Sequence, residues 1–356
     1  TFYNASILYN GPTSTITVTD GALTAVSPPI AVNPGRIGAF SLFALSPQTA
    51  GTVFPLLVTA LDIFNNVKTD YSASMAFSDN RTGGSAVYNP PALAAGSWLS
   101  GLATLTPGVY FTKAETINVT GQSSYRSGVS NAIEIGNATP ASLLMSVTTT
   151  SPNSGIPFSV TVRALDEFGN IARNYVGQIR FSCNDTHPSV LLPSDYQFVA
   201  GDAGEKIFTS QFVLITPGPV MLQVVDMVNA TMTHQFPLSV LPGPATRFDL
   251  SCNATQTAGV RFNLLIKVYD DYGNLKTNFS ETVSLLTAFE TVMPVSAGGF
   301  SNGQLLVPSV ELNDSGLLPA ENTIACKFGS VYGDRLVNLL PPSTLFERFD
   351  LETVPA

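Results

Sequence analysis

The chain has 356 residues, of which 44% are hydrophobic and only 12% are charged, and its formal net charge is −9. This balance argues against a clustered basic face that would bind nucleic acid and against attachment to anionic lipid headgroups. No run of about 18 apolar residues occurs, so we predict no membrane span. The length suits three β-sandwiches of roughly 100 residues each.

The first element, residues 1–34, has the pattern of an incomplete module or a donor-strand segment. Leu8 is followed by Asp20 after 12 residues, and Leu214 is followed by Asp226 at the same interval. Strands without sheet partners expose apolar side chains and unpaired backbone groups. The segment either completes a sheet in a neighbouring protomer by strand addition or is one end of a longer array. Its apolar residues that need partners are Ile7, Leu8, Ile16, Val18, Ile30 and Val32.

Three complete modules are predicted at residues 35–137, 138–242 and 243–341, because one motif recurs three times in register. Its copies are separated by 104 residues, and such internal self-similarity indicates tandem structural repeats. The positions that keep this spacing are the glycines Gly51, Gly155 and Gly259, the phenylalanines Phe54, Phe158 and Phe262, and the aspartates Asp62, Asp166 and Asp270.

Each copy of the motif predicts a strand that ends in a turn. Apolar Phe158 and Val160 alternate with polar Ser159 and Thr161, the period of two that is typical of a half-buried strand. The pattern Asp-x-aromatic-Gly/Asn-Asn then predicts a turn, since Asp and Asn bond nearby backbone N–H groups and Gly or Asn tolerates positive φ. Frequent Gly/Pro turns and the lack of helical periodicity complete the prediction. The fold class is all-β, with three tandem immunoglobulin-like antiparallel β-sandwich modules and incomplete strand segments at both termini.

The last element, residues 342–356, is predicted to be a strand-like tail. Its segment from Arg348 to Leu351 repeats the segment from Arg247 to Leu250, the predicted first strand of the third module. The tail therefore resembles the opening strand of a further module, and its apolar residues also need partners. These residues are Phe346, Phe349 and Leu351.

The motif resembles the immunoglobulin-like repeats of large bacterial surface proteins. Invasin/intimin-type stalk modules and filamin-type modules are related in style. The similarity covers residues 35–341 and is clearest from Gly155 to Phe181. It is specific for the type of module, and the resemblance implies a stalk, spacer, adhesin or filament subunit. Asn65 replaces the turn glycine in the first module, and Asp314-Ser-Gly316 replaces a Thr-Pro-Gly turn in the third.

Nine Asn-x-Ser/Thr sequons occur, roughly twice the number that chance predicts from the composition. We interpret them as N-glycosylation sites of a secretory-pathway protein, although a chain rich in Asn and Thr also produces sequons by accident. The predicted sites are Asn4, Asn80, Asn118, Asn137, Asn184, Asn229, Asn253, Asn278 and Asn313.

The three cysteines, Cys183, Cys252 and Cys326, have no spacing that is typical of a zinc or redox motif. Cys252 and Cys326 both belong to the third predicted module and could form one disulfide, which leaves Cys183 unpaired. The alternative is three buried free thiols that pack as small hydrophobic side chains.

The sequence offers little that would support catalysis. It contains two histidines, His187 and His234, and lacks the Gly-x-Ser-x-Gly, His-Glu-x-x-His and phosphate-loop motifs. The repeated aspartates are candidates for calcium ligands, but a turn-capping role explains them more simply. Trp98 could serve as a sugar platform, but a role in the core is more common for such a residue.

We therefore predict a non-enzymatic, extracellular structural protein without a cofactor. The first hypothesis is a glycosylated subunit of an extracellular fibre or surface appendage, which forms a homopolymer by strand complementation between protomers through its terminal segments. The alternative is the rod-like stalk of a cell-surface adhesin whose binding domain lies outside this chain. Tandem modules with short linkers agree with both.

Overall fold

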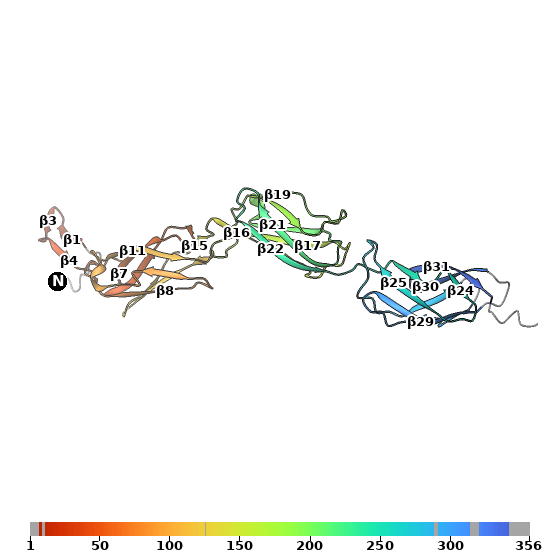
Figure 1. Ribbon diagram of the computed structural model, residues 1–356. Helices are drawn as coiled ribbons and strands as arrows, with labels where there is room; N and C mark the ends of the chain where they lie inside the picture. The colour runs from red at the N-terminus through yellow and green to blue at the C-terminus, as the bar shows by residue number, and fades with distance from the viewer. Residues whose placement is uncertain (1–6, 9–10, 125, 288–290, 314–319, 342–356) are drawn as a thin grey trace, which may run out of the picture. The chain divides into compact units, whose positions relative to one another are not determined.

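The computed structural model describes residues 7–8, 11–124, 126–287, 291–313 and 320–341 (Figure 1). Within these ranges the helical elements are two three-residue 3₁₀ turns, η1 Ala95–Ser97 and η2 Ala200–Asp202, and strands dominate. The all-β prediction is confirmed. No helix in the described part of the chain is long and apolar enough to cross a bilayer.

Residues 11–136 contain fifteen strands, and each sheet that they form stays within one predicted segment. The sheets have the strand orders β1-β4, β2-β3, β5-β7-β11-β9, β10-β8-β13-β14 and β12-β15-β6. The strands are β1 Gly11–Ser14, β2 Thr17–Asp20, β3 Leu23–Val26, β4 Ile30–Val32, β5 Ile37–Phe43, β6 Gln48–Thr49, β7 Phe54–Asp62, β8 Met75–Asp79, β9 Ala86–Asn89, β10 Ala92–Leu93, β11 Leu102–Phe111, β12 Thr116–Ile117, β13 Val119–Gln122, β14 Ser127–Val129 and β15 Ile133–Gly136.

The following residues form further sheets in which most strand pairs are antiparallel, while β31 pairs in parallel with β23 and β24. Their sheets have the orders β16-β17-β20, β19-β18-β21-β22 and β27-β29-β25-β23-β31-β30-β26-β28, with β24 also paired to β31. The strands are β16 Pro140–Val147, β17 Phe158–Asp166, β18 Gln178–Cys183, β19 Tyr196–Gln197, β20 Glu205–Phe212, β21 Gly218–Asp226, β22 Thr233–Val240, β23 Arg247–Ser251, β24 Thr255–Thr257, β25 Phe262–Tyr269, β26 Val283–Thr287, β27 Thr291–Met293, β28 Ser296–Ala297, β29 Gln304–Asn313, β30 Ala320–Phe328 and β31 Val331–Leu340. We keep the names module 1, 2 and 3 for residues 35–137, 138–242 and 243–341.

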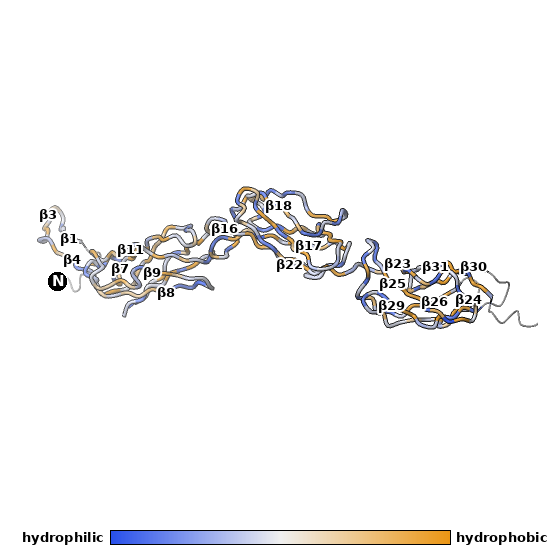
Figure 2. The backbone as a smooth tube through the Cα atoms, in the orientation of Figure 1, coloured by the Kyte–Doolittle hydropathy of each residue, from blue (hydrophilic) through white to orange (hydrophobic). Residues whose placement is uncertain are grey.

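The repeated motif forms the strands β7, β17 and β25, which alternate buried and more exposed side chains as predicted. The alternation is visible as changes between apolar and polar colour along the strands in Figure 2. Phe54 and Phe158 are buried, and their rings lie 6.2 Å from Phe111 and 5.7 Å from Phe212. Phe262 is only half-buried. The 104-residue repeat predicts the same buried position for all three phenylalanines, and the exposure of Phe262 corrects this prediction.

The strand pairing does not explain this difference. The register between β25 and β29 shifts between Phe262 and Leu264, and the register between β7 and β11 shifts at the corresponding place, between Phe54 and Leu56. Phe54 is nevertheless buried. Phe262 lies at the margin of the core, which it still contacts.

The N-terminal segment forms two small antiparallel pairs of its own. β1 pairs with β4, and β2 pairs with β3. Every side chain of β2 and β3 is exposed. An isolated two-stranded hairpin is at best marginally stable in water. These two pairs therefore do not supply the packing partners that the sequence predicts for the apolar side chains of residues 1–34.

Candidate functional site at the module junctions

The repeated aspartate organises a turn and ties it to the first residue of its own module, which follows the linker from the module before. Asp166 is the last residue of β17 and is buried. Its Oδ1 accepts hydrogen bonds from the backbone N–H groups of Phe168 and Asn170, at 2.9 and 2.8 Å. Its Oδ2 accepts from the side-chain amide of Asn170 and from the backbone N–H of Ala138, both at 2.8 Å. One carboxylate thus fixes a turn and a linker together.

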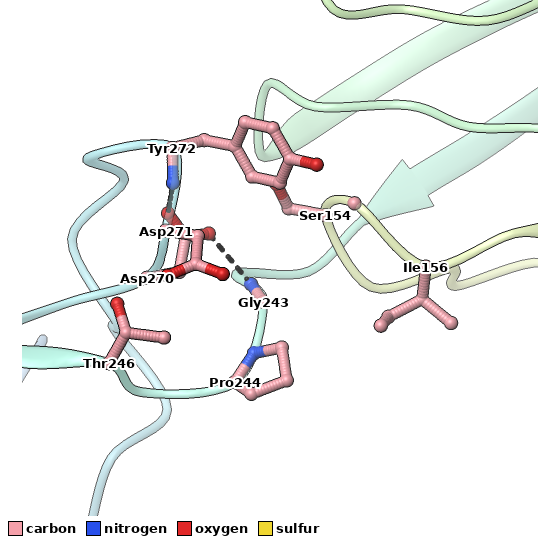
Figure 3. A pocket seen from close by; sticks show the side chains of 9 residues that line it. Ser154, Ile156, Gly243, Pro244, Thr246, Asp270, Asp271 and Tyr272 are labelled. Carbon is pink, nitrogen blue, oxygen red and sulfur yellow. Dashed lines mark hydrogen bonds between the residues drawn. The ribbon is translucent and has the colours of Figure 1, made fainter. Parts of the chain in front are cut away.

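The same bonds occur in the other two modules. Asp62 accepts from the backbone N–H groups of Phe64, Asn66 and the linker residue Gly35, and from the Asn66 amide. Asp270 accepts in the same way from Tyr272, Asn274, the linker residue Gly243 and the Asn274 amide (Figure 3). The prediction that these aspartates cap turns is confirmed.

The residue before each turn asparagine has a positive φ, as the motif predicts. The values are 64° at Asn65, 83° at Gly169 and 80° at Gly273. Asn and Gly are the residues that adopt this backbone region most readily, which explains why Asn65 can replace glycine in module 1.

The hydrogen bonds to Asp62 affect its ionisation. Burial raises the pKa of this carboxyl, but the bonds from Asn66, Gly35 and Phe64 outweigh burial and lower the pKa from 3.8 to about 2. A folded-state pKa below the unfolded value contributes stability that is present above the unfolded value and is lost as the pH falls through the folded value.

We therefore expect the stability of module 1 to fall as the pH decreases from about 5 to about 2. The single tryptophan, Trp98, lies in this module, so denaturant unfolding followed by its fluorescence reports on the correct segment. In Asp62→Asn, the free energy of unfolding of module 1 should depend less on pH over this range. Asp271 is exposed and adjacent to the third turn aspartate, and Asp271→Asn should show the same pH dependence as the unmodified chain. Equal slopes in all three proteins would contradict the assignment.

The turn asparagine also reaches beyond its own module, which the sequence analysis missed. The Asn170 amide donates to the carbonyl of Thr112 in module 1 at 2.8 Å, and its oxygen accepts from the Ala114 N–H at 2.9 Å. The Asn274 amide donates to the carbonyl of Ile215 and to the hydroxyl of Ser154 in module 2, at 2.9 and 3.0 Å. Each of these asparagines therefore joins two successive modules.

The first turn makes a similar bond with the N-terminal segment. The Asn66 amide donates to the carbonyl of Leu8 at 2.7 Å. Residues 1–34, which the sequence predicts to be an incomplete module, thus provide a backbone acceptor for Asn66, as the preceding modules do for Asn170 and Asn274.

The turn aromatic packs against the repeated glycine of the preceding module. A Cβ added to Gly51 would lie 2.4 Å from Cζ of Phe168, and one added to Gly155 would lie 2.2 Å from Cε2 of Tyr272. Only a residue without a side chain allows rings to approach so closely. The Tyr272 ring also makes an edge contact with His187, with ring centroids 5.9 Å apart.

Figure 3 shows this arrangement around the turn of module 3. Tyr272 and Ser154 lie on one side and Gly243 lies below, with its N–H bonded to Asp270. The residues surround a small pocket of about 120 Å³. The acceptor atoms of Asp270 already receive N–H donors, so the turn is suited to joining segments of chain rather than to binding a cation.

The remaining polar candidates do not form a second site. His187 Nδ1 accepts from the Ser189 N–H, and His234 Nδ1 accepts from the Met145 N–H. Within the described residues, no three His, Cys, Asp or Glu side chains are placed to hold a metal ion. Trp98 donates to the Ala73 carbonyl at 2.8 Å, and its ring lies 4.6 Å from that of Tyr71. Trp98 is half-buried and packs against the core of module 1, which favours the core interpretation.

The predicted disulfide between Cys252 and Cys326 is not formed, and all three cysteines are free thiols. Cys252 follows β23, Cys326 lies on β30, and β31 runs between these strands. Cys326 pairs with Gly333 of β31, and Arg247 pairs with Tyr332, so Cys326 is level with the start of β23 and Cys252 lies about four residues farther along. Four strand residues amount to about 13 Å, more than the ~7 Å between Cα atoms that a disulfide spans. Burial raises the pKa of the Cys326 thiol to about 12. The alternative of buried free thiols holds for Cys326, but Cys183 and Cys252 are half-buried.

The predicted glycosylation sites are mostly accessible. Asn118 and Asn137 are half-buried, and their amides donate to the carbonyls of Ser130 and Ala138. Asn4 lies outside the described residues. Glycosylation itself stays a prediction. The exposed sites are Asn80, Asn184, Asn229, Asn253, Asn278 and Asn313.

The residues predicted to mediate assembly differ in their surroundings. Ile7, Leu8, Ile16 and Val18 are exposed, whereas the side chains of Ile30 and Val32 are half-buried. Strand donation to another chain stays a prediction. The other three candidates, Phe346, Phe349 and Leu351, lie outside the described residues.

Comparison with known proteins gives a relationship at the level of fold. No protein-family model and no curated protein sequence matches the chain. The solved structure of FdeC, an Escherichia coli adhesin, is 14% identical, with a TM-score of 0.51 over 86% of this chain and 99% of the other. The chain shares the immunoglobulin-like fold of adhesin repeats.

Two further structures have lower scores. Invasin, described as a bacterial integrin-binding protein, is 13% identical, with a TM-score of 0.40 over 85% of this chain and 60% of its own length. The surface-layer protein SbsC is 15% identical, with a TM-score of 0.25 over 90% of this chain and 42% of its own. The FdeC structure confirms the predicted resemblance for the module type, and similarity this distant concerns the fold alone.

Proposed function

We propose that this chain is a non-enzymatic stalk segment of an extracellular, adhesin-like surface protein. Its task would be to carry other domains on an array of immunoglobulin-like modules. The observation that carries the proposal is the repeated joint: an aspartate holds the linker, an asparagine bonds the preceding module, and an aromatic residue packs on its glycine. Such a joint resists separation of neighbouring modules, which is what a stalk requires.

The surroundings of the joint support the same function. The carboxylates and amides of these turns bond mostly to backbone groups and to one another, so these polar groups serve to hold chain segments. The fold is shared with a bacterial adhesin, and a surface uncommonly poor in charge with accessible sequons suits an extracellular protein.

Labelling of intact cells tests the proposal. Antibodies raised against residues 35–341 should bind cells that produce the protein without permeabilisation, and protease added outside should remove the signal. An antibody against an abundant intracellular protein of the same cells is the control, and it should bind only after permeabilisation. Binding of both antibodies only to permeabilised cells would overturn the proposal. Treatment of the protein from its native source with an enzyme that removes N-linked glycans should also lower its mass if the sequons carry glycans.

A second candidate function is a fibre subunit that donates its N-terminal strands to a neighbour. The observation that favours it is the complete exposure of the side chains of β2 and β3, because exposed strands can pair with other chains. Deletion of residues 1–34 should then abolish any fibres seen by negative-stain microscopy and leave the β-sheet circular dichroism of modules 1–3 unchanged. Fibres that persist after the deletion would rule out this mode of assembly.

A further inference from the structure

The glycine of module 3 has the same backbone setting as the two glycines that receive a turn aromatic. The φ values of Gly51, Gly155 and Gly259 are 76°, 75° and 75°. Their N–H groups donate to the carbonyls of Phe111, Leu214 and Leu312 at 2.8, 2.9 and 2.9 Å. The preceding residues also bond alike. Ala50, Ser154 and Ala258 donate to the carbonyls of Gly136, Leu241 and Leu340. The backbone at Gly259 therefore has the same conformation and hydrogen bonds as the backbone at Gly51 and Gly155, the two glycines that contact a turn aromatic.

The three positions differ in what covers the glycine. Phe168 covers Gly51 and Tyr272 covers Gly155, but a Cβ added to Gly259 meets no atom of the described residues within 4 Å. Gly259 has a positive φ of 75°, and glycine adopts this conformation without the steric penalty that a side chain brings. The open space beside it is what distinguishes this glycine from its two counterparts.

A matching hydrogen-bond acceptor stands beside the free glycine. At the two used joints, the accepting carbonyls of Thr112 and Ile215 belong to the residue after the partner of the glycine N–H. The corresponding residue in module 3 is Asn313, which follows Leu312 at the end of β29 and is exposed. The Asn313 carbonyl therefore occupies the place where a turn asparagine amide binds.

We propose that Gly259 and the Asn313 carbonyl form the docking site for the Asp-x-aromatic-Gly/Asn-Asn turn of a following module. The aromatic ring would lie on Gly259, and the asparagine amide would donate to the Asn313 carbonyl. Ala258 stands where module 2 has Ser154, so the docked asparagine makes no bond to a hydroxyl there. The expected contacts match those at Ala50 and Gly51 in module 1.

The occupant is a module joined in the same chain direction rather than a second copy of this chain. The segment Arg348–Leu351 repeats the sequence at the start of module 3. Module 3 is therefore followed by residues that are typical of the beginning of a module. The first turn of a second copy is the less suitable occupant, because its Asn66 amide already donates to Leu8. This inference concerns the joint alone and holds whether or not the protein is located at a cell surface.

An extended chain tests the site. Residues 248–341 are copied and fused after Arg348, and thermolysin cleavage between the third and the added module is timed by mass spectrometry. We expect at least fivefold faster cleavage when Gly259 is replaced by alanine, or when the tyrosine copied from Tyr272 is replaced by alanine. Combining both changes should add little, because each removes the same contact.

Two controls keep the result interpretable. Gly259→Ala in the chain of native length should leave its β-sheet circular dichroism unchanged, and a second fusion should carry a copy of residues 145–242 with its own Asp166–Asn170 turn. Equal cleavage rates in the fusions with and without Gly259→Ala would overturn the proposal. Concentration-dependent dimerisation of the unextended chain that Gly259→Ala abolishes would also overturn it, because the occupant would then be a second copy.

Discussion

Replacing Asp62 with alanine should destabilise module 1 by about 2 kcal/mol or more, because a buried donor left without a partner costs about 1–3 kcal/mol and the three donors concerned are partly buried. The substitution removes the acceptor of the backbone N–H groups of Gly35, Phe64 and Asn66. It also releases the Asn66 amide, which orients toward Leu8. Urea unfolding followed by Trp98 fluorescence measures the change within this module.

The matched control is Asp70→Ala. Asp70 lies in the same module and forms one exposed ion pair with Lys68, and such pairs contribute about 0–1 kcal/mol. If Asp62→Ala lowers the free energy of unfolding no more than Asp70→Ala does, the turn carboxylate does not stabilise the module through its hydrogen bonds.

Replacing Phe54 with alanine should cost about 3–5 kcal/mol, through lost burial and the cavity that remains. Phe54 begins β7, is almost fully buried, and packs against Phe111. The same Trp98 measurement applies. Phe64→Ala is the control, because Phe64 has the same chemistry but is about half exposed in the turn. A loss below about 1 kcal/mol at Phe54 would exclude it from the core.

The equivalent substitution in module 3 should have a smaller effect. Phe262 is half-buried beside the register shift of β25, so its removal leaves a smaller cavity. The repeat in the sequence predicts three equal positions, whereas Phe262 is only half-buried. Burial of a side chain depends on neighbours from distant strands, which the repeated motif does not contain.

The turns illustrate what local sequence can predict. Asp-x-aromatic-Gly/Asn-Asn contains the capping carboxylate and the residue with positive φ, and both appear as expected at Asp166 and Gly169. The partner of the aromatic was not predictable in this way. Tyr272 follows Gly259 by 13 residues and Gly155 by 117, and in a repeat either glycine is a reasonable partner. Only the folded chain shows that Tyr272 packs on Gly155.

The cysteines illustrate the same limit. Cys252 and Cys326 share a module and an oxidising compartment in the sequence-based prediction, but cysteine counts contain no information on strand order. The intervening strand β31 separates them.

The most direct test of the joint compares Gly155→Ala with Gly259→Ala in the chain of native length. Both glycines have a φ of 75°, so both substitutions introduce the same backbone strain, but only the new methyl group at residue 155 collides with Tyr272. The measurement is the rate of thermolysin cleavage in the linker at residues 241–247, with the site identified by mass spectrometry. We predict cleavage at least fivefold faster for Gly155→Ala and unchanged for Gly259→Ala. Equal rates for the two variants would contradict the conclusion that the turn aromatic and the glycine of the preceding module hold neighbouring modules together.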